Sequence, residues 1–301
     1  MKPIICVGHA ALDYVYRIEA FPPEPMKVRS LEHIESGGGM AANAAATIAR
    51  LGGNVELWSR TGSDSAGQRI HAFLQADGVE TQFVRTYEGA RSSTSAVIVD
   101  NAGERLIIGE RDHSMSMDSS WLPLERIAGA AAVLSDFRWV EATRDAFREA
   151  RAHGVPTLLD ADLGGGGLLT EFLCLADYAI FSAPALDEFA PGMDERAQLE
   201  SVLSHGVRHA GVTRGADGYM WLSKSGASGH QPGFAAEIVD TTGAGDAFHG
   251  AYAFALAEGR PAPDCARIAA AVAALKCRKL GARAGLPTRA ELDEFLAARV
   301  D

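Results

Sequence analysis

Cysteine is scarce in this chain, and its spacing excludes two kinds of stabilised fold. The four cysteines, Cys6, Cys174, Cys265 and Cys277, form no C-x-x-C pair and have no histidine at zinc-ligand spacing. A disulfide framework or a structural zinc site would need such a pattern. We therefore expect four reduced cysteines in a cytoplasmic protein.

Positive charge is also in short supply. Lys and Arg number 28 against 39 Asp and Glu, which gives a formal net charge of -11. Such a charge opposes attraction to a phosphate backbone or to an anionic membrane surface. Long apolar runs are missing too. The N-terminal apolar run, at 4–8, is far shorter than a membrane span or a signal peptide. Neither nucleic acid nor a membrane is expected as a partner.

Short apolar runs alternate with helical patterns along most of the 301 residues. Such alternation is typical of an α/β fold with a mainly parallel sheet. No linker divides the chain, so one domain over 1–301 is expected. The expected strands are 4–8, 54–60, 81–85, 131–134, 157–159, 178–181 and 209–213, and the expected helices are 40–51, 64–77, 143–153, 197–204, 244–258, 264–276 and 289–298.

Two pairs of extended runs interrupt this alternation. The first pair is 14–18 and 28–34, and the second is 93–99 and 105–108, around the turn Asp100-Asn101-Ala102-Gly103. We interpret both pairs as one small antiparallel sheet over the substrate side, a lid formed by about 14–35 and 92–110. Its apolar side chains favour a homodimer through the lid, because a small sheet is marginal alone; those side chains are Val97, Val99, Ile107 and Ile108.

The strongest local motif is Asp240-Thr241-Thr242-Gly243-Ala244-Gly245-Asp246, directly before a helical pattern. Glycines at a helix start leave backbone amides free to bind a developing negative charge. Asp246, in the first turn, could accept a proton from an alcohol that attacks a phosphoryl group. The alternative is an ordinary turn in which the aspartate caps the helix.

A second motif, Gly37-Gly38-Gly39-Met40-Ala41-Ala42-Asn43, lies near the other end of the chain. Glycines allow a polyhydroxylated ligand to approach the backbone, and an asparagine side chain offers both a donor and an acceptor to vicinal hydroxyls. Taken alone, this motif is equally consistent with a structural turn before an alanine-rich helix.

The two motifs, in this order, resemble the two signatures of the ribokinase/PfkB family of carbohydrate kinases. The resemblance extends over the chain through Asp13, 60–67 and 213–218. It implies a three-layer α/β/α sandwich with a small β-sheet lid, and transfer of phosphate from ATP, with Mg²⁺, to a primary hydroxyl of a ketose-type sugar. Residue by residue, it implies Asp246 as the catalytic base, with the anion hole at Gly243, Ala244 and Gly245, and sugar binding by Asp13, Gly38, Gly39 and Asn43. It further implies nucleotide contacts from Arg105, Thr213, Gly215, Gly218, Ala274, Cys277 and Gly281, and a monovalent cation, K⁺, at Asp240 and Thr242.

One departure from the family concerns magnesium. Many members carry an Asn-x-x-Glu motif, and the corresponding stretch here is Ser182-Ala183-Pro184-Ala185. Ketohexokinases and 6-deoxy-6-sulfofructose kinases resemble this chain in lacking that motif. Magnesium is still expected, with different protein contacts.

Within the family, the chain most resembles the bacterial 6-deoxy-6-sulfofructose kinases. The resemblance implies that Lys27 and Arg138 bind the sulfonate, although Gly109 stands where those enzymes use an asparagine. The alternatives are a solvated Lys27, and an Arg138 that pairs with a nearby carboxylate. Alternative functions are a kinase for fructose, ribose or a nucleoside, and a sugar-binding sensor without turnover.

Overall fold

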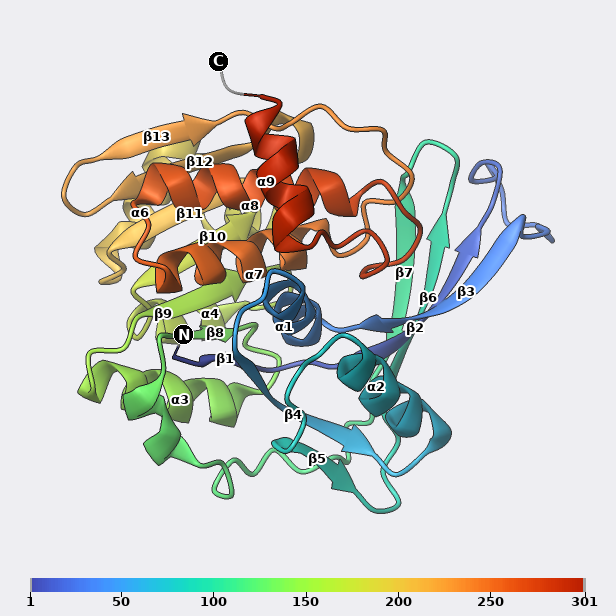
Figure 1. Cartoon of the computed structure of the whole chain (residues 1–301), viewed down its shortest axis with the longest axis horizontal. Helices are drawn as coiled ribbons and strands as arrows, with labels where there is room; N and C mark the ends of the chain where they lie inside the picture. The colour runs from blue at the N-terminus through green and yellow to red at the C-terminus, as the bar shows by residue number, and fades with distance from the viewer. Residues whose placement is uncertain (1, 300–301) are drawn as a thin grey trace.

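The computed structural model describes residues 2–299, which form a large sheet and a small one (Figure 1). The large sheet has nine strands in the order β13-β12-β11-β10-β9-β8-β1-β4-β5, parallel from β11 to β5. The strands are β1 (Ile4–Val7), β4 (Val55–Gly62), β5 (Val84–Tyr87), β8 (Ala132–Ser135), β9 (Thr157–Ala161), β10 (Tyr178–Ser182), β11 (His209–Thr213), β12 (Tyr219–Ser223) and β13 (Ser228–Gln231).

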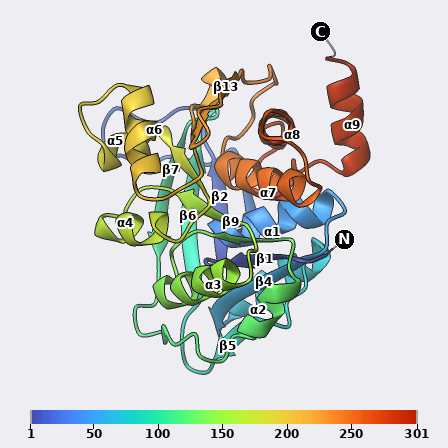
Figure 2. The same cartoon turned by 90° about the vertical axis from the view of Figure 1, so that its left-hand side faces the viewer.

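Helices cover both faces of the large sheet, as Figure 2 shows. Alternate residues of β1 explain this arrangement: Ile4 and Cys6 belong to one apolar core, while Ile5 and Val7 belong to the other. The first core is closed by α1 (Met40–Arg50), α2 (Ser65–Ala76), α7 (Ala244–Ala257), α8 (Ala262–Lys276) and α9 (Arg289–Ala297). The second is closed by α3 (Val140–Ala152), α4 (Gly167–Leu173), α5 (Ala183–Phe189), α6 (Glu195–Ser204) and the 3₁₀ helix η1 (Leu124–Gly129). The expectation of a three-layer α/β/α sandwich is confirmed.

The small sheet contains β2 (Ala11–Arg17), β3 (Glu32–Gly38), β6 (Ser93–Val99) and β7 (Arg105–Glu110), in the order β3-β2-β6-β7. The expected antiparallel sheet is wrong in one respect, because β2 and β6 run parallel. Each hairpin is antiparallel within itself, and the two hairpins join through their first strands.

Strand β3 begins and ends later than the sequence predicts. It continues through Gly37 and Gly38, because these glycines pair with β2 rather than forming a turn. A Cβ atom on Gly38 would overlap the Asp13 carboxylate, so only glycine lets the strand run against that side chain. The next residue, Gly39, has φ 89° and directs the chain into α1.

Among the strands and α-helices of residues 2–299, the sequence does not predict β12, the edge strand β13, or the short helices α4 and α5. Both strands follow turns that contain a glycine, at Gly218 and Gly226, and they have only five and four residues, while each of these helices has seven. No helix within residues 2–299 is long and apolar enough to cross a membrane.

Candidate active site

A cavity of about 1240 Å³ lies at the carboxyl ends of the parallel strands, under the small sheet. Residues from both ends of the chain line it, including Asp13, Asn43 and Asp246. Parallel strands present their carboxyl ends at one edge, where ligands bind in open α/β sheets. Its volume exceeds that of many single-ligand pockets.

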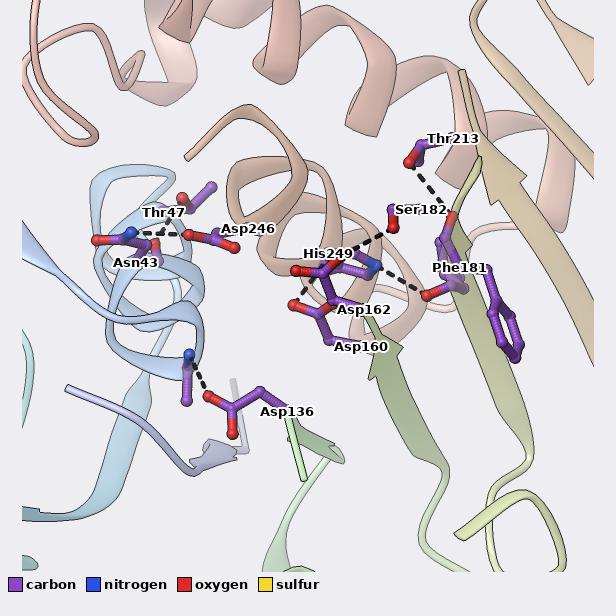
Figure 3. A network of polar contacts seen from close by, with 12 residues as sticks. Asn43, Thr47, Asp136, Asp160, Asp162, Phe181, Ser182, Thr213, Asp246 and His249 are labelled. Atoms are coloured by element: carbon purple, nitrogen blue, oxygen red, sulfur yellow. Dashed lines mark hydrogen bonds and ion pairs between the residues drawn. The ribbon is translucent and has the colours of Figure 1, made fainter. Parts of the chain in front are cut away.

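The two motifs meet in this cavity through a hydrogen bond. The Nδ2 atom of Asn43, on α1, donates to Oδ2 of Asp246, on α7, at 2.7 Å (Figure 3). The Nε atom of Arg283 donates to Oδ1 of Asn43 at 2.8 Å, so the amide of Asn43 is oriented with its NH2 group toward the carboxylate. Arg283 is itself fixed by Asp77 Oδ2 at 3.0 Å and by the Gly38 carbonyl at 3.1 Å.

The start of α7 leaves backbone amides free beside Asp246. Gly243 is the N-cap, with φ 74°, a left-handed conformation that glycine adopts without strain. Within residues 2–299, the amides of Gly243, Gly245 and Asp246 donate to no protein acceptor, whereas the amide of Ala244 donates to the Thr241 carbonyl at 3.2 Å. Three amides at the positive end of a helix can therefore bind an anionic oxygen.

Burial sets the protonation of Asp246. Loss of solvent raises the pKa of this carboxyl to about 7, the Asn43 hydrogen bond opposes the rise, and the negative charge of Asp162 adds to it. A base with a pKa near 7 is suited to proton transfer at neutral pH.

His9 and Asp13 lie in the same cavity. Asp13 Oδ1 accepts a hydrogen bond from Ser95 Oγ, which fixes its orientation. Burial, followed by the charges of Arg111, Arg138 and Arg60, lowers the pKa of His9 to about 3, so the imidazole is neutral. Its Nε2 atom has no hydrogen-bond partner within the described residues and remains available to a ligand.

Two further aspartates, Asp160 and Asp162, lie at the carboxyl end of β9. Asp160 is buried, and its Oδ2 lies 3.3 Å from Nδ1 of the buried His249 (Figure 3). Asp162 Oδ1 accepts a hydrogen bond from Ser182 Oγ at 2.8 Å. Burial, then the charges of Asp246 and Asp162, raises the pKa of Asp160 well above its usual value. Both carboxylates line the cavity.

Most residues expected at the nucleotide also line the cavity: Arg105, Thr213, Gly215, Gly218, Ala274 and Cys277. The side chain of Arg105 is exposed, and its NH1 donates to Thr241 Oγ1 at 2.7 Å. Gly281 does not line the cavity, and its amide instead donates to Asp240 Oδ2 at 2.7 Å.

Neither of the two residues expected at the sulfonate, Lys27 and Arg138, lines the cavity. Lys27 is exposed in the loop before β3. The Arg138 guanidinium donates to the Leu163 carbonyl at 2.9 Å and makes no ion pair with a carboxylate in residues 2–299. Among the substrate residues expected, Gly39 lines the cavity and Gly38 lies behind it, at the Asp13 carboxylate.

Several site residues escaped sequence-based reasoning. Asp160 and Asp162 follow a strand that was predicted, and their position at its carboxyl end was the available signal. Arg111 lines the cavity next to β7. No local sequence pattern indicates that Arg283 belongs to the site, because its contacts are with residues more than 200 positions away.

Comparisons with known proteins agree with this geometry. Residues 1–289 match the pfkB family carbohydrate kinase model. The chain is similar to the ribokinase of Bacillus subtilis, at 28% identity over 300 residues that cover 99% of this chain and 100% of the relative.

Solved structures give the same result. A protein of Agrobacterium tumefaciens, assigned provisionally as a ribokinase, is 35% identical with a TM-score of 0.93, over 99% of this chain and 98% of that one. The Arabidopsis thaliana ribokinase, solved with ribose and ATP, is 26% identical with a TM-score of 0.85, over 100% and 99%. The expectation of a carbohydrate kinase with a ribokinase-like fold is confirmed, and the chain belongs to the pfkB family of carbohydrate kinases.

Proposed function

We propose that this kinase transfers the γ-phosphate of ATP to a primary hydroxyl of a ketose-type sugar, with 6-deoxy-6-sulfofructose as the candidate. The observation that supports this most directly is the position of Asp246. Its carboxyl lies beside three free amides of α7 and is held by Asn43, in a cavity that also contains Asp13. The intact constellation argues for turnover rather than for a sugar-binding sensor.

Each step of the phosphate transfer is assigned to particular residues. The carboxylate of Asp246 takes the proton of the sugar hydroxyl, whose oxygen forms a bond to the γ-phosphorus while the bond to the bridging oxygen of ADP breaks. The free amides of Gly243, Gly245 and Asp246 stabilise negative charge on the phosphoryl oxygens. Asp13 and Asn43 orient the sugar, and His9 Nε2 is a further contact for a hydroxyl. The small sheet acts as a lid that excludes water.

Asp160 and Asp162 fit the magnesium ion that accompanies ATP, in place of the missing Asn-x-x-Glu. Magnesium prefers oxygen ligands and usually takes one or two carboxylates together with substrate phosphates. Oδ2 of Asp160 is buried and accepts no hydrogen bond from residues 2–299, so it has capacity for a cation. When bound, the ion neutralises charge on the phosphates.

The charges near His9 favour an anionic group on the sugar. Arg111, Arg138 and Arg60 all lie close enough to lower the pKa of His9, and Arg111 lines the cavity. We therefore assign the anion contact to Arg111, with Arg138 as a nearby positive charge that does not line the cavity, and not to the exposed Lys27. A relative from Halopiger xanaduensis, 27% identical, is an ATP-dependent ribose-1-phosphate kinase, whose substrate is also an anionic sugar.

Ribose itself is the second candidate substrate. The ribokinases of Bacillus subtilis and Arabidopsis thaliana, at 28% and 26% identity, favour it over a nucleoside.

A coupled assay of ADP release tests this proposal, with sulfofructose, fructose, fructose 6-phosphate, tagatose and ribose as acceptors. Preference for sulfofructose that is lost in Arg111→Met but kept in Lys27→Met supports the anionic substrate. Preference for a neutral sugar leaves the kinase chemistry in place and removes the anion contact. If none of these acceptors raises ADP release above the rate of ATP hydrolysis without acceptor, the result argues against this class of substrate.

The activity should depend on pH through Asp246. Since its pKa is raised to about 7 and the base acts in its deprotonated form, we expect kcat/KM to rise as the pH increases through about 7 and then to level off. The profile of kcat/KM between acidic and mildly alkaline pH measures this. A profile that is flat across neutral pH would contradict the assignment of the base.

We also propose that the outer face of the small sheet forms a homodimer interface. The expectation that Val97, Val99 and Ile107 belong to it is wrong, because the two valines are buried in a core cluster under the sheet and Ile107 lines the cavity. Leu106 and Ile108, on β7, point to the other face and are 51% and 61% exposed.

Light scattering on a size-exclusion column should give twice the chain mass for the unmodified protein. It should give the monomer mass for Ile108→Lys, because a buried lysine charge opposes association. A monomer for the unmodified protein at micromolar concentration would remove this proposal.

A further inference from the structure

A lysine ammonium is buried next to the motif that carries the catalytic aspartate. Lys276 is the last residue of α8 and is fully buried, and its Nζ atom donates to the backbone carbonyl of Asp240 at 2.8 Å. An ammonium group is expensive to bury unless an acceptor or an opposite charge compensates for lost water. Asp240 is also fully buried and provides both.

The oxygens of Asp240 are already occupied by protein donors. Its carbonyl accepts from Lys276, its Oδ1 from the amide of Thr242 at 2.7 Å, and its Oδ2 from the amide of Gly281 at 2.7 Å. This set joins the end of α8 and the loop around Gly281 to the segment that leads, three residues later, into the anion hole at Gly243.

The same place was expected to hold a monovalent cation. A potassium ion needs several oxygen ligands, and the oxygens of Asp240 already have donors. A second cation would also be repelled by the ammonium. Thr242 Oγ1 has no partner within residues 2–299, but Thr242 lines the cavity, so that oxygen is available to the nucleotide instead. The residues therefore do not fit a resident potassium ion.

We propose that the ammonium of Lys276 replaces the monovalent cation in this enzyme, so that turnover does not require K⁺. Lys276 is a positioning residue: it neutralises the buried Asp240 and holds the segment that presents the free amides of α7. This inference rests on the kinase activity of the site, but not on the identity of the sugar. Burial lowers the pKa of Lys276 and the Asp240 charge raises it, so the aspartate favours the charged form.

The test compares turnover and thermal melting in buffers whose cation is potassium, ammonium or tetramethylammonium, which is too large for such a site. The unmodified enzyme should have the same kcat and the same Tm in all three. Lys276→Met keeps the length of the side chain and removes its charge. It should lose about 10²-fold in kcat in tetramethylammonium, because the segment that positions the amides shifts.

Potassium or ammonium should then restore part of that loss and raise the Tm of Lys276→Met, since a small cation can enter beside Asp240. Lys279→Met, at an exposed position just after α8, is the matched control and should show no cation dependence. Activation of the unmodified enzyme by potassium would overturn the inference. The inference would also be overturned if the kcat and the Tm of Lys276→Met were the same with all three cations. If the unmodified enzyme turns over no sugar, the proposed function fails, and the Tm comparison still decides the role of Lys276.

Discussion

Asp246→Asn should lower kcat by a factor on the order of 10² to 10⁴, the usual contribution of a positioned general base. The asparagine has nearly the same shape, and its carbonyl oxygen can still accept the hydrogen bond that Asn43 Nδ2 donates at 2.7 Å. It cannot take the proton of the sugar hydroxyl. Substrate binding should therefore change much less than kcat, because Asp13, Asn43 and the free amides stay in place.

The fold should tolerate this change. Burial raises the pKa of Asp246 to about 7, so the folded state favours the protonated form and loses stability as the pH rises through that value. Asparagine stays neutral, and the Tm of the variant at pH 8 should equal or exceed that of the unmodified protein.

Steady-state kinetics and melting curves, with Asp293→Asn as a control, measure both effects. Asp293 lies on α9 with a side chain that is 61% exposed, and its loss should leave both quantities unchanged. A kcat for Asp246→Asn within a few-fold of the unmodified value would show that another group accepts the proton.

The sequence predicts those parts of the site in which one short segment carries both the chemistry and the backbone conformation. At 240–246, the glycines that turn the chain and the aspartate that acts are neighbours, so the residue pattern alone indicates both the turn and its chemistry. The parallel strands are equally predictable, because burial on both faces requires continuous apolar runs.

Contacts between distant segments could not be predicted in this way. The parallel pairing of β2 with β6 depends on how two hairpins dock, and each hairpin alone is compatible with either direction. Lys276 is similar: a lysine at a helix end is usually explained by the helix dipole, and only the packing of α8 against the 240 loop buries it. Lys27 is the opposite case: the family resemblance places its charge in the site, but the residue is exposed on the surface.

Arg283→Met should combine a large loss of stability with a change in the pH profile. Arg283 is buried and binds Asn43 Oδ1, the Gly38 carbonyl and Asp77 Oδ2, so its removal takes a donor away from three acceptors. Removal of one partner of a buried ion pair costs about 3–5 kcal/mol. The Asp77 side chain is 23% exposed and regains some water, so we expect the lower end of that range and a fall in Tm on the order of 10 °C.

The pH profile separates a role in the site from a role in the fold. Arg283 carries a positive charge near Asp246 and orients the Asn43 amide that donates to it, and both effects lower the pKa of the carboxyl. In Arg283→Met that pKa should rise, and the acidic limb of the kcat/KM profile should move to higher pH.

Arg283→Lys is the matched variant for this argument. It keeps the charge but cannot reach three acceptors at once, because a lysine lacks the planar fork of a guanidinium. It should lose stability as Arg283→Met does, while its acidic limb stays near that of the unmodified enzyme. If both variants lose stability and neither limb moves, Arg283 supports the fold only, and the orientation of Asn43 must come from elsewhere. If the acidic limb of the kcat/KM profile moves in Arg283→Met alone, the charge of Arg283 lowers the pKa of Asp246. The hydrogen bonds that connect the two residues then link the end of α2, at Asp77, to the loop between α8 and α9.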